Sequence, residues 1–245
     1  MKDELRLFMR SARGAEYVLN ENISVRHPTL GEICEFGETE YYSMATALCG
    51  YPSLYKASLH DIGVDYTEIT DYELFCMMSQ GMGAETTAPL LGALDLSKLR
   101  LGKNDETGEI VLCDSVGGSP RVVVDRAIYT DLVGYLRNMH GFEKKDEIPA
   151  DEYTKNYLIE RERKRLARQK RKPFRSLLKP MISAMVNQPG FKYDYSTVWD
   201  LPIHIFNDSV ARTQKFLHYS HLMTGAYTGN VSLKEVKRED LNWLG

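Results

Sequence analysis

Apolar residues recur every three or four positions along most of the chain, but between about residues 94 and 124 the spacing changes. Leu94, Leu96, Leu99 and Leu101 roughly alternate, and residues 110–113 and 122–124 are short apolar runs bounded by turn residues. A spacing of three or four predicts helices, whereas short runs between turns predict strands. We therefore expect a mainly α (α+β) fold with a small three-stranded β-meander near the middle.

Two capping-box patterns mark helix starts in the first half of the chain. Thr29 is followed three residues later by Glu32, and Thr70 by Glu73. In such a pair each side chain satisfies a free backbone N–H of the helix terminus. Together with the apolar spacing and the Gly and Pro positions, these patterns predict helices at about residues 29–49, 52–61, 71–80 and 125–140. A loop is expected at 81–92, and a short helix at 4–13.

A polar, charged stretch at residues 143–149 is the expected boundary between a helical domain at 1–145, which carries the meander, and an all-helical region at 150–245. In that region we expect a charged helix at 151–171. Apolar residues at helical spacing from Phe174 to Met185 predict another helix, kinked at Pro180. Asp200 is the expected cap of a long helix towards Met223, and Ser232 starts a further capping-box pattern.

The chain lacks the sequence features of membrane and secreted proteins. No run of 18 apolar residues is present, and the charged N-terminus is followed by no apolar segment, so neither a membrane span nor a signal peptide is expected. The four cysteines have no C-x-x-C spacing, which favours reduced core thiols and a cytoplasmic location.

Charge is distributed unevenly. Residues 161–175 carry a net charge of +8, although the whole chain carries −3. Such a segment is a solvated helix face, a docking surface for an acidic protein, or a nucleic-acid contact; the pI of about 6.1 and the lack of interleaved aromatics favour the first two. The candidate partner-binding residues are Arg161, Arg163, Lys164, Arg165, Arg168, Lys170, Arg171 and Lys172.

No pattern in the sequence predicts catalytic, cofactor-binding or metal-binding residues. Gly81 and Gly83 form an isolated G-x-G without a preceding strand, which is typical of a turn. His218 and His221 could lie one helical turn apart, but no further ligand has suitable spacing for zinc. We therefore expect a protein that is not an enzyme and has no cofactor.

Tyrosine is abundant, with 15 residues in the chain. Ordinary core packing explains most of them, yet tyrosine is also favoured at interfaces because it offers a large contact area at little entropic cost. Self-association is therefore a further expectation.

Several stretches resemble proteins encoded in the tail-gene modules of phages and prophages of Gram-positive bacteria. They are Thr29-Leu30-Gly31-Glu32-Ile33, Glu40-Tyr41-Tyr42-Ser43-Met44, Asp71-Tyr72-Glu73-Leu74-Phe75-Cys76, and the C-terminal part from Phe191-Lys192-Tyr193 through Val198-Trp199-Asp200-Leu201-Pro202 and Met223-Thr224-Gly225-Ala226-Tyr227 to Leu241-Asn242-Trp243. The layout is similar to that of tail assembly chaperones.

The resemblance implies a non-enzymatic role in the cytoplasm of the bacterial host. Such chaperones coat the tape measure protein, deliver tail tube subunits to it and are absent from the finished virion. The β-meander departs from a compact helical chaperone. Two alternatives therefore stay open, a structural virion component such as a connector or baseplate part, and a nucleic-acid-binding regulator.

Overall fold

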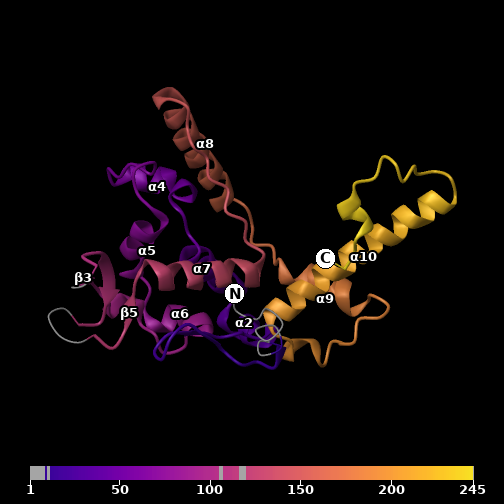
Figure 1. Cartoon of the computed structure of the whole chain (residues 1–245), viewed down its shortest axis with the longest axis horizontal. Coiled ribbons are helices and arrows are strands. Elements are labelled where there is room, and N and C mark those ends of the chain that lie inside the picture. Colours follow the sequence, from indigo (N-terminus) through magenta and orange to yellow (C-terminus); the bar gives the residue numbers. More distant parts are fainter. Residues whose placement is uncertain (1–8, 10–11, 105–106, 116–119, 245) are drawn as a thin grey trace.

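The structure is a computed structural model that describes residues 9, 12–104, 107–115 and 120–244. Of the helix expected at residues 4–13, residues 4–8, 10 and 11 lie outside these residues. The described chain is mainly α with a small three-stranded antiparallel sheet, which confirms the fold class predicted from hydrophobic spacing. Figure 1 shows the sheet at one side of the molecule, α8 at its upper edge and α10 extending from the opposite side.

The N-terminal half begins with a short antiparallel pair of strands, β1 (Tyr17–Val18) and β2 (Ser24–Val25). The helices and 3-10 turns that follow are α2 (Leu30–Phe36), α3 (Glu38–Leu48), η1 (Pro52–Leu54), α4 (Lys56–Asp61), α5 (Asp71–Ser79), α6 (Ala84–Leu91), η2 (Leu96–Lys98) and α7 (Arg126–His140).

Local sequence signals account for several of these helix boundaries. The Thr29 hydroxyl accepts the Glu32 N–H at 3.1 Å, and the Glu32 carboxylate accepts the Thr29 N–H at 2.8 Å. Thr70 forms the same capping box at the start of α5. Gly37 lies between α2 and α3 and has a φ of 107°. This backbone conformation interrupts the helix and is unfavourable for residues that carry a Cβ, which explains the glycine. Both capping boxes predicted in the first half of the chain are therefore confirmed.

The meander consists of β3 (Arg100–Lys103), β4 (Ile110–Cys113) and β5 (Val123–Val124), in that order. Leu112 lies in the middle, opposite Leu101 on one side and Val124 on the other, and it is fully buried. The first strand starts later than the alternation from Leu94 predicts. Leu96 begins the 3-10 turn η2 instead, and its burial in the core holds this turn in place.

The prediction of a loop at residues 81–92 is wrong, because most of this segment forms α6. This helix contains Pro89, and the sequence before it is rich in threonine and glycine, so local propensity argues against a helix. Leu90 is 0% exposed and Leu91 is 4% exposed. Burial of these side chains in the main core stabilises α6 against its own propensity.

The C-terminal half is helical, with the elements α8 (Glu152–Lys170), α9 (Leu178–Val186), η3 (Val198–Asp200), α10 (Ile203–Tyr227) and η4 (Arg238–Leu241). No helix in the described ranges is both long and apolar enough to cross a membrane.

Three boundaries in this half differ from the sequence prediction. Because α9 begins only at Leu178, Pro180 lies in its first turn, where the missing N–H is not needed, and it does not interrupt the helix. Phe174 is consequently outside the helix and 67% exposed. The N-cap of α10 is Pro202, whereas Asp200 ends η3. Ser232 starts a turn and not a helix.

The C-terminal half is joined to the N-terminal half by backbone hydrogen bonds. The Leu30 N–H donates to the Leu201 carbonyl at 3.0 Å, and the Ile203 N–H donates to the Pro28 carbonyl at 2.9 Å. The start of α9 is held similarly, since one Glu38 oxygen accepts the N–H groups of Leu177 and Leu178 at 2.5 and 2.9 Å. The base of α10 and most of α9 thus pack on the main core.

Candidate functional site

The basic residues singled out in the sequence lie on α8 and just after it, and α8 packs along α4. Ile159 is 2% exposed and belongs to a small apolar cluster with Leu59 and Leu74. Near the start of the helix, Lys155 pairs with Asp65, and this hydrogen bond, together with weaker contributions from Thr67, lowers the pKa of the Asp65 carboxyl to about 2. One face of α8 is therefore fixed to the body, and the opposite face is open to solvent.

Three of the eight candidate residues are used within the chain. Arg161 pairs with Glu147, and Arg163 pairs with Asp61 of α4 and with Glu160. Arg165 donates two hydrogen bonds, of 2.6 and 2.7 Å, to the buried carboxylate of Glu162. These contacts also raise the pKa of the Arg163 and Arg165 guanidinium groups. The first part of the basic segment thus contributes to holding α8 in place.

The other five candidate residues form no ion pair with any residue that the structure describes. All five are exposed, and they follow one another from the second half of α8 into the turn after it. We call this group, Lys164, Arg168, Lys170, Arg171 and Lys172, the unpaired basic end. Lys164, Arg168 and Arg171 share one face of the helix because they are four and three residues apart.

Glu147 was not recognisable as a structural residue from the sequence, where it belongs to a polar linker. In the structure its carboxylate joins Lys56 of α4 to Arg161 of α8. These contacts lower its carboxyl pKa. Lys144 in the same linker pairs with Asp71 at 2.9 Å. The linker therefore follows the surface of the body, and no local pattern identifies its partners because they lie far away in the sequence.

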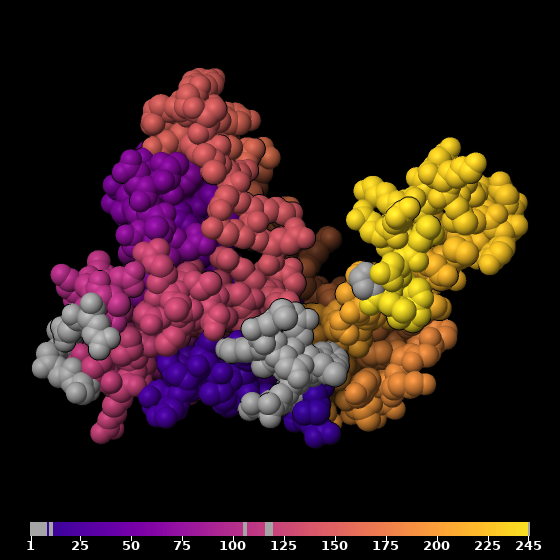
Figure 2. All heavy atoms as spheres, in the orientation of Figure 1, coloured from indigo at the N-terminus to yellow at the C-terminus, as the bar shows by residue number. Residues whose placement is uncertain are grey.

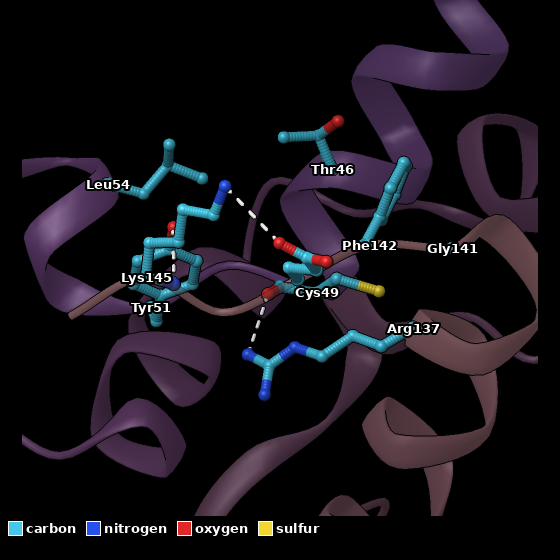
Figure 3. A pocket seen from close by; sticks show the side chains of 9 residues that line it. Thr46, Cys49, Tyr51, Leu54, Arg137, Gly141, Phe142 and Lys145 are labelled. Carbon is cyan, nitrogen blue, oxygen red and sulfur yellow. Dashed lines mark hydrogen bonds and ion pairs between the residues drawn. The ribbon is translucent and has the colours of Figure 1, made fainter. Parts of the chain in front are cut away.

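A cavity of about 380 Å³ lies where the end of α3 meets the end of α7 (Figure 3). On one side of it the Arg137 guanidinium donates to the Cys49 carbonyl at 2.9 Å, and on the other Lys145 pairs with Glu143 at 3.2 Å. The Arg137 guanidinium also lies 5.8 Å from the ring centre of Tyr51, whose hydroxyl accepts the backbone N–H of Lys145 at 3.3 Å. Arg137 also pairs with Asp71 at 3.6 Å, so each charged group that lines this cavity already has a partner in the chain.

The thiols do not form a reactive pair. All four cysteines are free, and Cys34 is exposed, contrary to the expected core position. Burial raises the pKa of the Cys49 thiol to about 12, so it stays protonated near neutral pH and is a weak nucleophile. Of the two histidines with helical spacing, His218 lies 3.5 Å from Asp240. No group of three potential metal ligands occurs within the described ranges.

Two histidines meet at the base of α10. The rings of His27 and His204 have centroids 4.6 Å apart, and the His27 Nε2 lies 2.5 Å from the Tyr135 hydroxyl. Both ring nitrogens of His204 are buried and have no hydrogen-bond partner among the described residues. Burial, with a smaller contribution from His27, lowers the pKa of His204 from 6.5 to about 4. Burial also lowers the pKa of His27.

Comparison with known proteins gives one match. Residues 168–245 match the family model described as the YomV second domain, and this family is associated with phages and prophages. The C-terminal third resembles a phage-associated domain. The match begins inside α8 and covers α9, α10 and η4, so it includes four residues of the unpaired basic end. No curated protein and no solved structure matches the chain.

Proposed function

We propose that this protein is a non-enzymatic factor of phage morphogenesis that binds other phage proteins, with the unpaired basic end of α8 as a docking surface for an acidic partner. The main support for the proposal is that the basic segment consists of a part that is paired within the chain and a part that is not. Arg161, Arg163 and Arg165 have acidic partners in the chain, whereas the five residues of the unpaired basic end have none among the described residues.

Electrostatics supports a binding role for this surface. Like charges four residues apart destabilise a helix, and Lys164 and Arg168 have this spacing. The negative end of the helix dipole offsets part of the repulsion at the last turn. An acidic protein would remove the remainder and would be attracted over a distance of about 8–10 Å at moderate ionic strength.

The finer proposal is that the protein is a tail assembly chaperone that binds the tape measure protein and tail tube subunits in the cytoplasm of the bacterial host. Two observations support it. Several stretches of the sequence resemble such chaperones, and the C-terminal third matches a phage-associated family. The proposal of an acidic partner is independent of this finer assignment.

A co-purification experiment tests the docking surface. The chain is co-expressed with the tape measure and tail tube proteins of the same phage, and the captured amount is measured. Each exposed charge contact contributes roughly 0.2–1 kcal/mol. Changing Lys164, Arg168 and Arg171 together to Glu should therefore weaken capture by about tenfold or more.

The matched control changes three exposed lysines away from α8, Lys103, Lys179 and Lys192, to Glu. It alters the net charge equally and should leave capture unchanged. Helix content measured by circular dichroism should stay the same in both variants. Equal capture by the α8 variant and the control would contradict the proposed docking surface.

Two further measurements address the alternatives. Retention of the purified chain on DNA, with a log–log salt slope of several units, would favour a nucleic-acid-binding regulator. A band for this chain in purified virions would favour a structural virion component and contradict the chaperone assignment.

A further inference from the structure

The outward face of α8 carries more than the unpaired basic end. Ile159 and Leu166 hold the opposite face of this helix against the body. Because a helix makes one turn in about 3.6 residues, Tyr153 and Tyr157 also lie on the outward face, in line with the cations that follow. The outer row of α8 consists of Tyr153, Tyr157, Lys164, Arg168 and Arg171, and it is roughly 27 Å long. Figures 1 and 2 show α8 at the upper edge of the molecule.

Both tyrosines of the outer row are exposed to solvent. Tyr153 is 84% exposed and Tyr157 is 59% exposed. Neither side chain forms a hydrogen bond or a ring contact with a described residue. Removing the large apolar area of a tyrosine ring from water is favourable, and tyrosine is therefore enriched at protein interfaces. Two such rings one turn apart are available to a partner.

The charge of the outer row changes along its length. Near the tyrosines, Glu160 follows Tyr157 by three residues and is its neighbour on the helix surface. In the middle of the row, Arg161 pairs with Glu147, and Glu160 pairs with Arg163. Cations without an ion pair among the described residues follow only towards the end of the helix. The outer row is thus aromatic at its start, neutralised in its middle and basic at its end.

This order of groups fits a protein better than a nucleic acid. A DNA strand carries one phosphate about every 3.4 Å, so it needs cations along its whole length. The cations nearest in sequence to the two tyrosines, Lys155 and Arg161, are already paired with Asp65 and Glu147. A protein can place apolar side chains over one end of the row and carboxylates over the other.

The geometry of the surface selects a helix as the partner element. The outer row is a ridge of side chains on a helix, and such ridges fit into the grooves of a second helix. An extended segment would instead need the free edge of a sheet for its backbone groups, and α8 offers none. The described part of a second copy does not supply the helix, since α3 and α5, whose first turns are acidic, bury most of their apolar side chains in the core.

We infer that the outer row of α8 binds an amphipathic helix of another protein, antiparallel to α8, with acidic residues in its N-terminal half and apolar residues in its C-terminal half. The acidic half lies over the unpaired basic end, and the apolar half covers Tyr153 and Tyr157. Carboxylates near a helix N-terminus are also stabilised by the helix dipole, which favours this orientation over the reverse one. The inference rests on the proposed docking role of α8 and adds the form, the orientation and the aromatic contact of the partner.

Variants of the two tyrosines test the aromatic contact in the capture experiment with the tape measure and tail tube proteins. Tyr153→Ser and Tyr157→Ser together should reduce capture at least about fivefold, because tyrosine is among the residues whose truncation weakens interfaces most. The reduction should be similar at low and high salt. The effect of changing Lys164, Arg168 and Arg171 to Glu should instead shrink as the salt concentration rises.

Tyr227→Ser is the matched control, because Tyr227 is 85% exposed at the end of α10. It should leave capture unchanged, and circular dichroism shows whether each variant keeps its helix content. Unchanged capture in the double tyrosine variant, or an equal loss in Tyr227→Ser, would overturn the inference. If the charge variant still weakens capture, the docking surface under the proposed function stands.

A pair of peptides tests the orientation without any phage protein. Both are about 20 residues long, enough to span the outer row, have the same composition and are locked into a helix by a lactam bridge. In the first peptide, one face carries glutamates in the N-terminal half and leucines in the C-terminal half; in the second, the halves are exchanged. Fluorescence anisotropy with the full chain should show at least about tenfold tighter binding of the first peptide. The double tyrosine variant should bind it at least about fivefold more weakly.

Each remaining outcome decides between the proposals. Equal binding of the two peptides, or no binding of the first, would overturn the inference. Retention on single-stranded DNA that is lost in the double tyrosine variant would overturn it in favour of a nucleic-acid contact through stacking. If the native chain captures neither the tape measure nor the tail tube protein, the chaperone assignment fails, and the peptide pair still decides the inference.

Discussion

Replacing His204 with phenylalanine tests the contact between His27 and His204 at the base of α10. The two ring nitrogens of His204 are buried without a hydrogen-bond partner among the described residues, so the folded protein favours the neutral ring. Phenylalanine keeps the size and shape of the ring and removes its titration. The substitution therefore separates the electrostatic contribution of the histidine from its packing.

The magnitude follows from the pKa of His204, which is about 4 in the folded chain instead of the ordinary 6.5. A folded-state pKa below the unfolded value means that the unfolded chain binds more protons. Stability from this group is thus complete above about pH 6.5 and is lost as the pH falls towards about 4. With about 1.4 kcal/mol for each pKa unit, the loss between about pH 7 and about pH 5 is about 2 kcal/mol.

Urea unfolding of the native chain and of His204→Phe, each at about pH 7 and about pH 5, measures this effect. The free energy of unfolding of the native chain should fall by about 2 kcal/mol more than that of the variant. His218→Phe, at an exposed position of the same helix, is the matched control and should behave like the native chain. Carboxylates titrate mostly below this pH window. The same pH dependence in the native chain and His204→Phe would refute the reasoning.

Three further expectations concern packing, capping and metal content. Leu178→Ala should lower the free energy of unfolding by about 2–5 kcal/mol, because Leu178 is buried. Phe174→Ala should change it by less than about 0.5 kcal/mol, because Phe174 is exposed. Equal effects of the two variants in denaturation would show that the start of α9 is wrongly placed. Thr29→Ala should reduce stability by about 1 kcal/mol through loss of the capping box, and no change in the denaturation midpoint would contradict this role. Changing His218 and His221 together to Ala should leave the metal content of the purified chain unaltered; stoichiometric zinc lost in that variant would contradict it.

Elements whose boundaries depend on local contacts were predictable from the sequence. The starts of α2 and α5 were predictable because Thr29 and Thr70 make their capping contacts within four residues. The end of α7 was predictable for the same reason, since Gly141 adopts the left-handed conformation that glycine favours. Two strands of the meander also follow from local apolar runs between turn residues.

Elements that depend on distant burial were not predictable. The segment that forms α6 has poor helix propensity, and its helix exists because Leu90 and Leu91 are buried against residues far away in the sequence. Phe174 has helical spacing with Leu178, yet the helix begins after it. Hydrophobic spacing shows where a helix could form, but the ends of the element depend on what packs against it.

At the candidate site, the basic segment was also predictable only in part. Its net charge of +8, the charged helix that carries most of it and its eight candidate residues were predictable from the sequence alone. Which of these residues remain unpaired was decided only by the tertiary structure, because Asp61 and Glu147, the partners of Arg163 and Arg161, come from α4 and the linker. The meeting of His27 with His204 is likewise invisible in the sequence. Periodicity and capping act over a few residues and can be predicted locally, whereas ion pairs and buried contacts join residues that only the fold brings together.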